Sequence, residues 1–540
     1  MNRREFVGIT SATAAHFFIT GCATRSNQSK VQLEEATISQ LQAAMQSGRE
    51  SAESLARKYL ARIEQLDRNG PKLNSVIELN PDALVIARDL DRERKEKAAR
   101  GPLHGIPVLL KDNIDTHDKM MTTAGSLALL GSHPLQDATV TRKLREAGAV
   151  ILGKTNLSEW ANFRGNKSTS GWSARGGLTR NPYVLDRDPS GSSSGSAAAV
   201  AANLCSFAIG TETDGSIVSP AAHCGIVGLK PTVGLISRAG IIPIAHSQDT
   251  AGPMGRTVAD VAAALGSLIG EDERDPVTIA SRGHTHLDYN QFLDRDGLRG
   301  ARIGVARKFF SKNSRANFIF EGSLKALEQA GAELIDPAEL PTHGKFGSAE
   351  REVLHYEFKA GLNAYLAALG SNAPVRSLEE VIAFNERNAG KELVFFGQET
   401  MIEAQKRGPL TDEKYLEALA TAKRLAGKEG IDAVMNKHRL DAIIAPTAGP
   451  ACRVDFVYGD RGEGGSSSPA AVAGYPNITV PAGFVYGLPV GISFFGRAWS
   501  EPVLLKLAFA FEQLTRVRKP PTYRPSMTWS EFPLAAQRKP

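Results

Sequence analysis

Three segments of this 540-residue chain carry residues that could act together on a carbonyl group. Lys111 follows the apolar run "GIPVLL", a cluster of serines lies in "PSGSSSGSAAAV", and Ser216 lies in "GTETDGSIVSPAAHCG". Cleavage of an amide requires a nucleophile, a base, and hydrogen-bond donors for the oxyanion that forms. A serine can be the nucleophile, a lysine can be the base, and backbone N–H groups can be the donors.

A lysine is a base only when its amine is neutral. Burial lowers a lysine pKa, and the strand expected at 105–110 would carry Lys111 into a dry interior. A serine between the lysine and the nucleophile could then relay the proton. Glycines around Ser216 would let consecutive backbone N–H groups face one point. Lysines at strand ends and Gly/Ser loops are also common at surfaces and in linkers, so the surrounding elements matter.

Those elements alternate between helix and strand. Residues 33–68 have helical spacing, and 105–110 and 149–153 have the pattern of buried strands. Residues 196–203 predict a helix of small residues, and the segment that follows them predicts a strand. Further strand patterns lie at 440–447 and 475–483. This alternation predicts an α/β core with a largely buried sheet. Residues of about 315–440 are helix-rich instead, and we expect them to form an inserted helical layer beside the core.

The composition is that of a globular enzyme. Hydrophobic residues are 42% and charged residues 23% of the chain, and the net charge of +6 arises from both signs mixed along it. The run at 88–100 alternates in sign, which favours a solvated helix face over a nucleic-acid patch. Four cysteines do not make a disulfide framework, and Cys205, Cys224 and Cys452 are expected to be small buried hydrophobes.

Several motifs in the chain match known functional patterns, but the residues within or before them do not have the properties that those functions require. "GAVILGKT" matches a phosphate-binding loop, but Ala, Val, Ile and Leu between its glycines predict a strand. "GSSSG", centred on Ser193, follows a polar loop rather than the strand of a nucleophile elbow. The chain has no S-x-x-K and no H-E-x-x-H, and His284 with His286 lacks a third metal ligand nearby.

Residues 191–232, "GSSSGSAAAVAANLCSFAIGTETDGSIVSPAAHCGIVGLKPT", strongly resemble the signature of the amidase signature family. "GIPVLLKDNIDT" and "GAVILGKTNLSEWA" resemble its upstream blocks, and "GLPVGISFFGRAWSE" resembles a downstream one. The similarity covers roughly residues 33–520. It implies a single large α/β/α core with a mixed sheet flanked by helices, and a serine amidase that needs no cofactor and no metal.

The resemblance also implies roles for individual residues. The family uses a Ser-cisSer-Lys triad, which places the nucleophile on Ser216, the bridging serine on Ser192 and the base on Lys111. Ser193 would be a supporting hydroxyl. The oxyanion hole would consist of the backbone N–H groups of Thr213, Asp214, Gly215 and Ser216.

The chain departs from the usual family pattern at several positions. Ser190 and Ser194 replace glycines, and "GTETDGSIV" replaces the usual G-T-D-x-G-G-S-I-R. "NLSEWANFRG" and "SGWSARGG" resemble the peptide amidase branch, whose members hydrolyse the C-terminal amide of peptides. The alternatives are the glutamine-hydrolysing subunit of a tRNA-dependent amidotransferase and an inactive binding lipoprotein. We expect specificity to lie in the helical insertion and in the loops near Trp160 and Trp172.

The first residues predict export. Arg3 and Arg4 resemble a twin-arginine signal over residues 1–21, and the four residues ending at Cys22 resemble a lipobox, which implies lipidation of Cys22. Residues 22–32 would be a tether, 33–520 the amidase domain and 521–540 a tail. No segment has the length of a membrane span, so we expect a protein that is anchored to a membrane by lipid, on the periplasmic side or the cell surface. The expected partner is a small-molecule or peptide amide.

Overall fold

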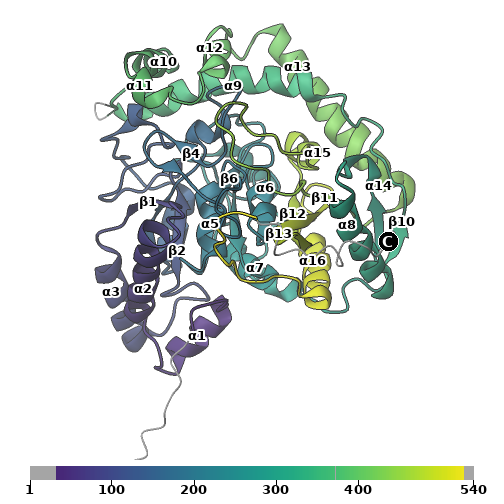
Figure 1. Ribbon diagram of the computed structural model, residues 1–540, viewed down its shortest axis with the longest axis horizontal. Coiled ribbons are helices and arrows are strands. Elements are labelled where there is room, and N and C mark those ends of the chain that lie inside the picture. Colours follow the sequence, from purple (N-terminus) through teal and green to yellow (C-terminus); the bar gives the residue numbers. More distant parts are fainter. Residues whose placement is uncertain (1–31, 371–372, 528–540) are drawn as a thin grey trace, which may run out of the picture.

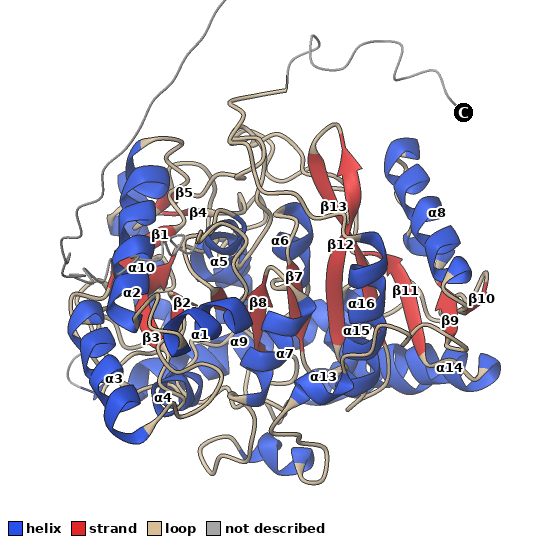
Figure 2. Ribbon diagram, turned by 90° about the horizontal axis from the view of Figure 1, so that it is seen from below, coloured by secondary structure: helices blue, strands red, loops and turns tan. Residues whose placement is uncertain are grey.

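The computed structural model describes residues 32–370 and 373–527, and these build one mixed sheet covered by helices on both faces (Figures 1 and 2). The expected signal peptide, the lipidation site Cys22 and most of the tether and tail lie outside the described residues. Among the helices of the described ranges, none has the length and apolar character to cross a membrane.

The sheet has eleven strands in the order β1-β3-β2-β6-β8-β7-β12-β13-β11-β9-β10. Strands β3, β2 and β6 are parallel to one another, as are β11, β9 and β10, and the other neighbours are antiparallel. The strands are β1 (Val76–Leu79), β2 (Pro107–Lys111), β3 (Val150–Thr155), β6 (Phe207–Glu212), β7 (Val227–Lys230), β8 (Thr250–Gly255), β9 (Arg302–Val305), β10 (Glu333–Ile335), β11 (Ala442–Pro446), β12 (Asn477–Val485) and β13 (Leu488–Phe495). A separate two-stranded ribbon comprises β4 (Trp172–Ser173) and β5 (Gly177–Leu178).

Helices cover this sheet and extend beyond it (Figure 1). Those around the core are α1 (Ile38–Gln46), α2 (Ala52–Arg62), α3 (Ala83–Lys97), α4 (Thr139–Glu146), α5 (Ser194–Ala201), α6 (Val218–His223), α7 (Val258–Gly266), α8 (Ser314–Gln329), α15 (Ser468–Ala473) and α16 (Glu501–Thr515). The others are α9 (Gly347–Ala368), α10 (Leu378–Arg387), α11 (Ala389–Glu392), α12 (Glu399–Gln405), α13 (Glu413–Lys423) and α14 (Asp432–His438). The α/β class and the mixed, helix-flanked sheet are therefore as expected from the sequence.

The helix-rich part begins later than the sequence suggests. Helix α8 connects the parallel strands β9 and β10, so it belongs to the edge of the sheet. Helices α9 to α13 form an arch over the core, drawn in green in Figure 1. The apolar side of α9, with Phe358 and Leu362, packs on Ala128 and Trp160 of the core. The arch is thus held against the loops that surround the candidate site.

Helix α5 lies flat on the centre of the sheet because its side chains are small. Its residues from Ser194 to Ala201 are all buried, and it contacts β2, β3, β6 and β8. A Cβ at Gly195 would meet the carbonyl oxygens of Ser75 and Asn156 at 2.4 Å, so only glycine fits there. This close packing sets the position of the serine loop that precedes the helix.

Two motifs take the structural forms expected of them. The central residues of "GAVILGKT" are strand β3, which is buried along its whole length, so the segment forms no phosphate-binding loop. His284 stacks on Trp499 and His286 packs on Tyr289 and Phe292. Cys205 and Cys224 are buried as expected, whereas Cys452 is only partly buried.

Candidate active site

The site lies at one edge of the sheet because parallel strands end there together. Strand β2 ends at Lys111 and its parallel neighbour β6 ends at Glu212, so the carboxyl ends of both strands meet. Helix α5 lies between the parallel strands β3 and β6 in the chain. Its amino end therefore lies at the carboxyl ends of these strands. Lys111, the serine loop at 190–193 and the turn at 213–217 thus converge, although more than a hundred residues separate Lys111 from the turn.

Lys111 is fully buried, and each of its hydrogen bonds goes to a neutral group. Its Nζ lies 2.7 Å from Ser192 Oγ, 2.9 Å from Thr211 Oγ1 and 3.2 Å from the carbonyl oxygen of Thr211. Burial lowers its pKa from 10.5 to about 7, and the negative charges of Asp249 and Glu212 oppose that shift. Near neutral pH a large fraction of this amine is therefore unprotonated, as a base requires.

Ser192 follows a cis peptide bond from Gly191. The Ser192 carbonyl accepts a hydrogen bond from the backbone N–H of Ser158 at 3.1 Å. A Cβ at Gly191 would meet Ser158 Oγ at 2.2 Å, so the loop can pass here only with glycine. The hydroxyl that the sequence singled out as a bridge is thereby held on the Nζ of Lys111.

Ser193 joins the serine loop to both the sheet and the turn. Its Oγ donates to the Thr211 carbonyl at 3.1 Å and accepts from the Thr211 N–H at 3.2 Å. Its backbone N–H donates to the carbonyl of Ser216 at 3.1 Å. The structure therefore brings Lys111, Ser192, Ser193 and Ser216 into one hydrogen-bonded unit.

Ser216 lies in the turn between β6 and α6, and only 7% of its surface is exposed. The turn needs Gly215, whose φ of +79° is in the left-handed region. The Glu212 carboxylate accepts hydrogen bonds from the N–H groups of Ile217 and Val218, at 2.8 and 3.0 Å. This contact fixes the turn on the side that leads into α6.

The other side of the turn is fixed by Thr213. Its hydroxyl donates to Asp249 Oδ1 at 2.5 Å. Within the described residues, no hydrogen bond uses the turn's own backbone N–H groups, those of Thr213, Asp214, Gly215 and Ser216. These contacts hold the turn in place, and its four N–H groups have no hydrogen-bond partner among the described residues.

A cleft of about 590 Å³ reaches the residues that hold this turn. Glu350 and Ser468 are among the residues that line it, and Ser468 donates to Asp214 at 2.6 Å. Its walls include Phe309, Phe310 and Phe346, together with Lys308, Lys312, His343 and the glycine-rich residues 462–465. An apolar chain with polar groups at intervals fits such a cleft.

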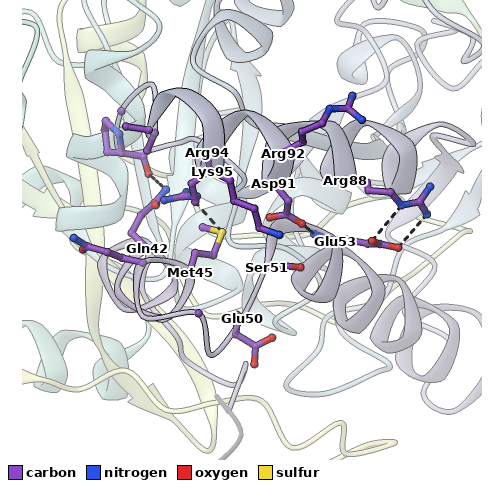
Figure 3. A pocket seen from close by; sticks show the side chains of 16 residues that line it. Gln42, Met45, Glu50, Ser51, Glu53, Arg88, Asp91, Arg92, Arg94 and Lys95 are labelled. Carbon is purple, nitrogen blue, oxygen red and sulfur yellow. Dashed lines mark hydrogen bonds and ion pairs between the residues drawn. The ribbon is translucent and has the colours of Figure 1, made fainter.

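A larger cavity, of about 1080 Å³, lies between α1, α2 and α3 and has no connection to these residues (Figure 3). Its charged groups stabilise the helices. Glu53 pairs with Arg88, and the Asp91 carboxylate accepts hydrogen bonds from the N–H groups at the start of α2. We therefore assign no reaction to it. No group of three or more His, Cys, Asp or Glu side chains in the described residues is arranged to hold a metal.

Sequence reasoning missed several residues of the site. Thr211, Glu212 and Asp249 hold the base and the turn, and Ser467 and Ser468 contact the turn from a segment more than 250 residues later. Trp160 and Trp172, named as candidates for specificity, are both buried. Trp172 packs edge-on against Phe395 and Phe396 of the arch.

Comparison with known proteins shows which family uses this arrangement. The sequence model of the Amidase family matches residues 54–505. A "Probable amidase" of Arabidopsis thaliana is 45% identical over 500 residues, which cover 91% of this chain and 92% of that protein. The chain belongs to the amidase family. It is therefore an amidase hydrolase, as the resemblance implied.

Solved structures show the same relationship. The peptide amidase PAM, in complex with the competitive inhibitor chymostatin, is 56% identical with a TM-score of 0.88, covering 90% of this chain and 99% of that one. The native peptide amidase of Stenotrophomonas maltophilia is 55% identical with a TM-score of 0.86, covering 91% and 99%. More distantly, one subunit of the glutamyl-tRNA(Gln) amidotransferase of Halorhodospira halophila is 34% identical over 499 residues, which cover 89% of this amidase and 98% of that protein.

Proposed function

We propose that this amidase hydrolyses the C-terminal carboxamide of peptides through an acyl-enzyme on Ser216. One observation carries the mechanism: a buried lysine with a pKa of about 7 bonds to Ser192 Oγ at 2.7 Å, and the same loop bonds to the Ser216 turn. The likeness to two peptide amidase structures at 55–56% identity supports the substrate class.

In the first half of the reaction, neutral Lys111 accepts the Ser192 hydroxyl proton while Ser192 accepts the proton of Ser216. Ser216 Oγ then forms a bond to the carbonyl carbon of the amide, and the carbonyl electrons move onto its oxygen. The free N–H groups of residues 213–216 are the donors for that oxyanion. When the intermediate collapses, the proton on Lys111 returns through Ser192 to the leaving nitrogen, and ammonia departs.

In the second half, water replaces ammonia. Lys111 and Ser192 accept a proton from the water as its oxygen attacks the ester carbonyl of the acyl-enzyme. The bond to Ser216 Oγ breaks, Ser216 recovers its proton, and the peptide leaves as a carboxylate. The peptide chain before the amide occupies the cleft whose lining includes Glu350 and Ser468.

The test compares the wild-type enzyme with Ser216→Ala on amidated dipeptides, with ammonia as the readout. Loss of the nucleophile lowers kcat by about a thousandfold or more. Ser323→Ala, on helix α8, removes a buried serine hydroxyl that bonds to the Ile319 carbonyl; it is the control and keeps activity. An active Ser216→Ala enzyme, with unchanged ammonia release, contradicts the assignment.

A second candidate is the glutamine-hydrolysing role in a tRNA-dependent amidotransferase, which the 34% identity to the Halorhodospira protein favours. Such an enzyme releases ammonia from free glutamine and works with partner subunits. The same ammonia assay separates the two candidates. Faster turnover of glutamine than of any amidated peptide, with co-purifying subunits, decides for the amidotransferase.

We also propose that the protein is exported and anchored by lipid on Cys22. Support comes from Arg3-Arg4 and the Gly21-Cys22 junction. Cells grown with labelled palmitate test this proposal. Wild type carries label in the membrane fraction and Cys22→Ser does not, whereas an unlabelled wild type in the cytosol refutes it.

A further inference from the structure

A small cavity of about 10 Å³ adjoins the hydrogen bonds that hold the proposed base. Its polar lining includes Asn113, Thr211, Thr213 and Asp249, and the isoleucines of 241–244 line it as well. Thr211 is the residue whose hydroxyl and carbonyl bond to the base, so the cavity lies one residue away from the reactive amine. A volume of this size holds one water molecule and no larger ligand.

Asn113 places an unpaired acceptor at this cavity. The residue is only 3% exposed, and its Nδ2 donates to Thr211 Oγ1 at 3.0 Å. Its carbonyl accepts from the N–H of Ile242 at 2.9 Å, which fixes its backbone. The Oδ1 of the same amide is buried and has no hydrogen-bond partner among the described residues. A buried amide oxygen is normally paired, so a donor is expected beside it.

The charged groups of the lining have protein partners. Asp249 Oδ1 accepts from Thr213 Oγ1 at 2.5 Å, and its Oδ2 accepts from two backbone N–H groups at 2.8 and 2.9 Å. The guanidinium of Arg238, also in the lining, pairs with the Asp275 carboxylate at 2.5 Å. In the described part of the chain, Asn113 Oδ1 is therefore the buried side-chain atom of this lining that lacks a partner.

The hydrogen bonds around Lys111 leave one hydrogen atom to place. A neutral amine has two N–H groups and one lone pair, and the Thr211 carbonyl can only accept, so one N–H points to it. Of the two hydroxyls that contact Nζ, those of Ser192 and Thr211, one accepts the second N–H and the other donates to the lone pair. Proton transfer from Ser192 requires Ser192 to be that donor. The Thr211 hydroxyl must then turn its hydrogen elsewhere.

We propose that the cavity binds one ordered water molecule, which accepts the Thr211 hydroxyl hydrogen and donates to Asn113 Oδ1. The water keeps the lone pair of neutral Lys111 directed at Ser192, which makes Asn113 a positioning residue of the base. Asp249, in the same lining, can accept the second hydrogen of the water, so the water makes the three hydrogen bonds usual for a buried site. This inference rests on the proposed function, because it assigns the water a role in that reaction.

A crystal structure of the wild-type enzyme, at a resolution that shows ordered water, tests the site directly. We expect density for one water molecule within hydrogen-bond distance of both Thr211 Oγ1 and Asn113 Oδ1. A cavity without such density overturns the inference, whether or not the enzyme is active. A cavity that holds the water in an enzyme that hydrolyses no amide refutes only the proposed function.

The role of the water is tested with Asn113→Leu, which removes its acceptor. The Thr211 hydroxyl then turns to Lys111 and competes with Ser192 for the lone pair, so kcat on an amidated dipeptide falls by about tenfold with little change in KM. Adding Thr211→Val removes the competing hydroxyl, and the double variant should be about threefold more active than Asn113→Leu. A merely structural defect is not repaired by the loss of a second hydrogen bond.

Asn385→Leu is the matched control. Asn385, on arch helix α10, is also fully buried, and its Oδ1 likewise has no partner among the described residues, so its replacement keeps activity. Wild-type kcat in Asn113→Leu, or a double variant no more active than that single one, contradicts the positioning role.

The pH profile supplies a further readout. Its acidic limb, where kcat/KM rises as Lys111 loses its proton, should persist in Asn113→Leu, because the base and the neighbouring charges of Asp249 and Glu212 are unchanged. Loss of that limb would mean that the base itself is displaced, which contradicts a role through the water.

Discussion

Replacing Lys111 by Met removes the proposed base while keeping a side chain of similar length. The structure predicts opposite effects on activity and on stability. Without the base, kcat/KM on an amidated peptide falls by about a thousandfold or more at every pH. Wild-type kcat/KM, by contrast, rises about tenfold between pH 6 and pH 8, because the neutral fraction of an amine with a pKa of about 7 rises by that factor.

The stability effect follows from the same pKa. Lys111 has a pKa of about 7 in the folded protein against 10.5 in an exposed chain, so between these values the unfolded chain binds more protons. The free energy of unfolding of the wild type therefore rises with pH across this window. Burying this lysine costs about 4 kcal/mol at pH 7 and about 2 kcal/mol at pH 9, and Lys111→Met avoids both costs.

The mutation also removes the hydrogen bonds to Ser192 and Thr211, each worth about 1 kcal/mol. That loss is nearly independent of pH, so the informative quantity is the change between the two pH values. Relative to wild type, Lys111→Met should lose about 2 kcal/mol of stability from pH 7 to pH 9. Urea unfolding at both pH values measures this change.

Lys154→Met is the matched control for activity. Lys154 is also fully buried, but it donates to Ile114 and Thr122 and touches none of the reactive serines. This control should keep the acidic limb of the pH profile. The reasoning fails if Lys111→Met retains a tenth of wild-type kcat/KM, or if its stability relative to wild type is the same at pH 7 and pH 9.

Three further changes test other parts of the site. Gly191→Ala should abolish activity, because its Cβ would lie 2.2 Å from Ser158 Oγ and displace the Ser192 loop; wild-type ammonia release would contradict this. Asp249→Asn should shift the acidic limb to lower pH, since it removes a negative charge that raises the pKa of Lys111, and a shift to higher pH would reverse the electrostatic argument. Charge reversal at Lys308 and Lys312 should lower kcat/KM for peptide amides with acidic residues but not for neutral ones, and equal effects on both would show that the peptide does not lie in the cleft.

The sequence alone determined the local elements and the chemistry of single residues. The apolar run before Lys111 specified a buried strand, and the small residues after Ser193 specified a helix that can pack closely on a sheet. These patterns suffice because hydrophobic periodicity and helix or strand propensity are set by residues close together in the sequence. The spaced motif from Gly191 to Thr232 also sufficed to indicate the family, which the comparisons confirmed.

The sequence pattern could not locate the edge of the helical insertion. Strands β9 and β10 are short, and the long helix α8 between them looks like the arch helices that follow. Only the parallel pairing of β9 with β10 and β11 shows that α8 belongs to the sheet.

Only the tertiary structure decided what surrounds the reactive residues. The carboxyl ends of β2 and β6 meet because these strands are parallel neighbours, and this pairing places Thr211 on Lys111 and leaves the amine buried. The contacts of Asp214 with Ser467 and Ser468 join segments more than 250 residues apart. A pKa depends on the groups and the solvent that surround a site in space, and no spacing along the chain encodes those neighbours.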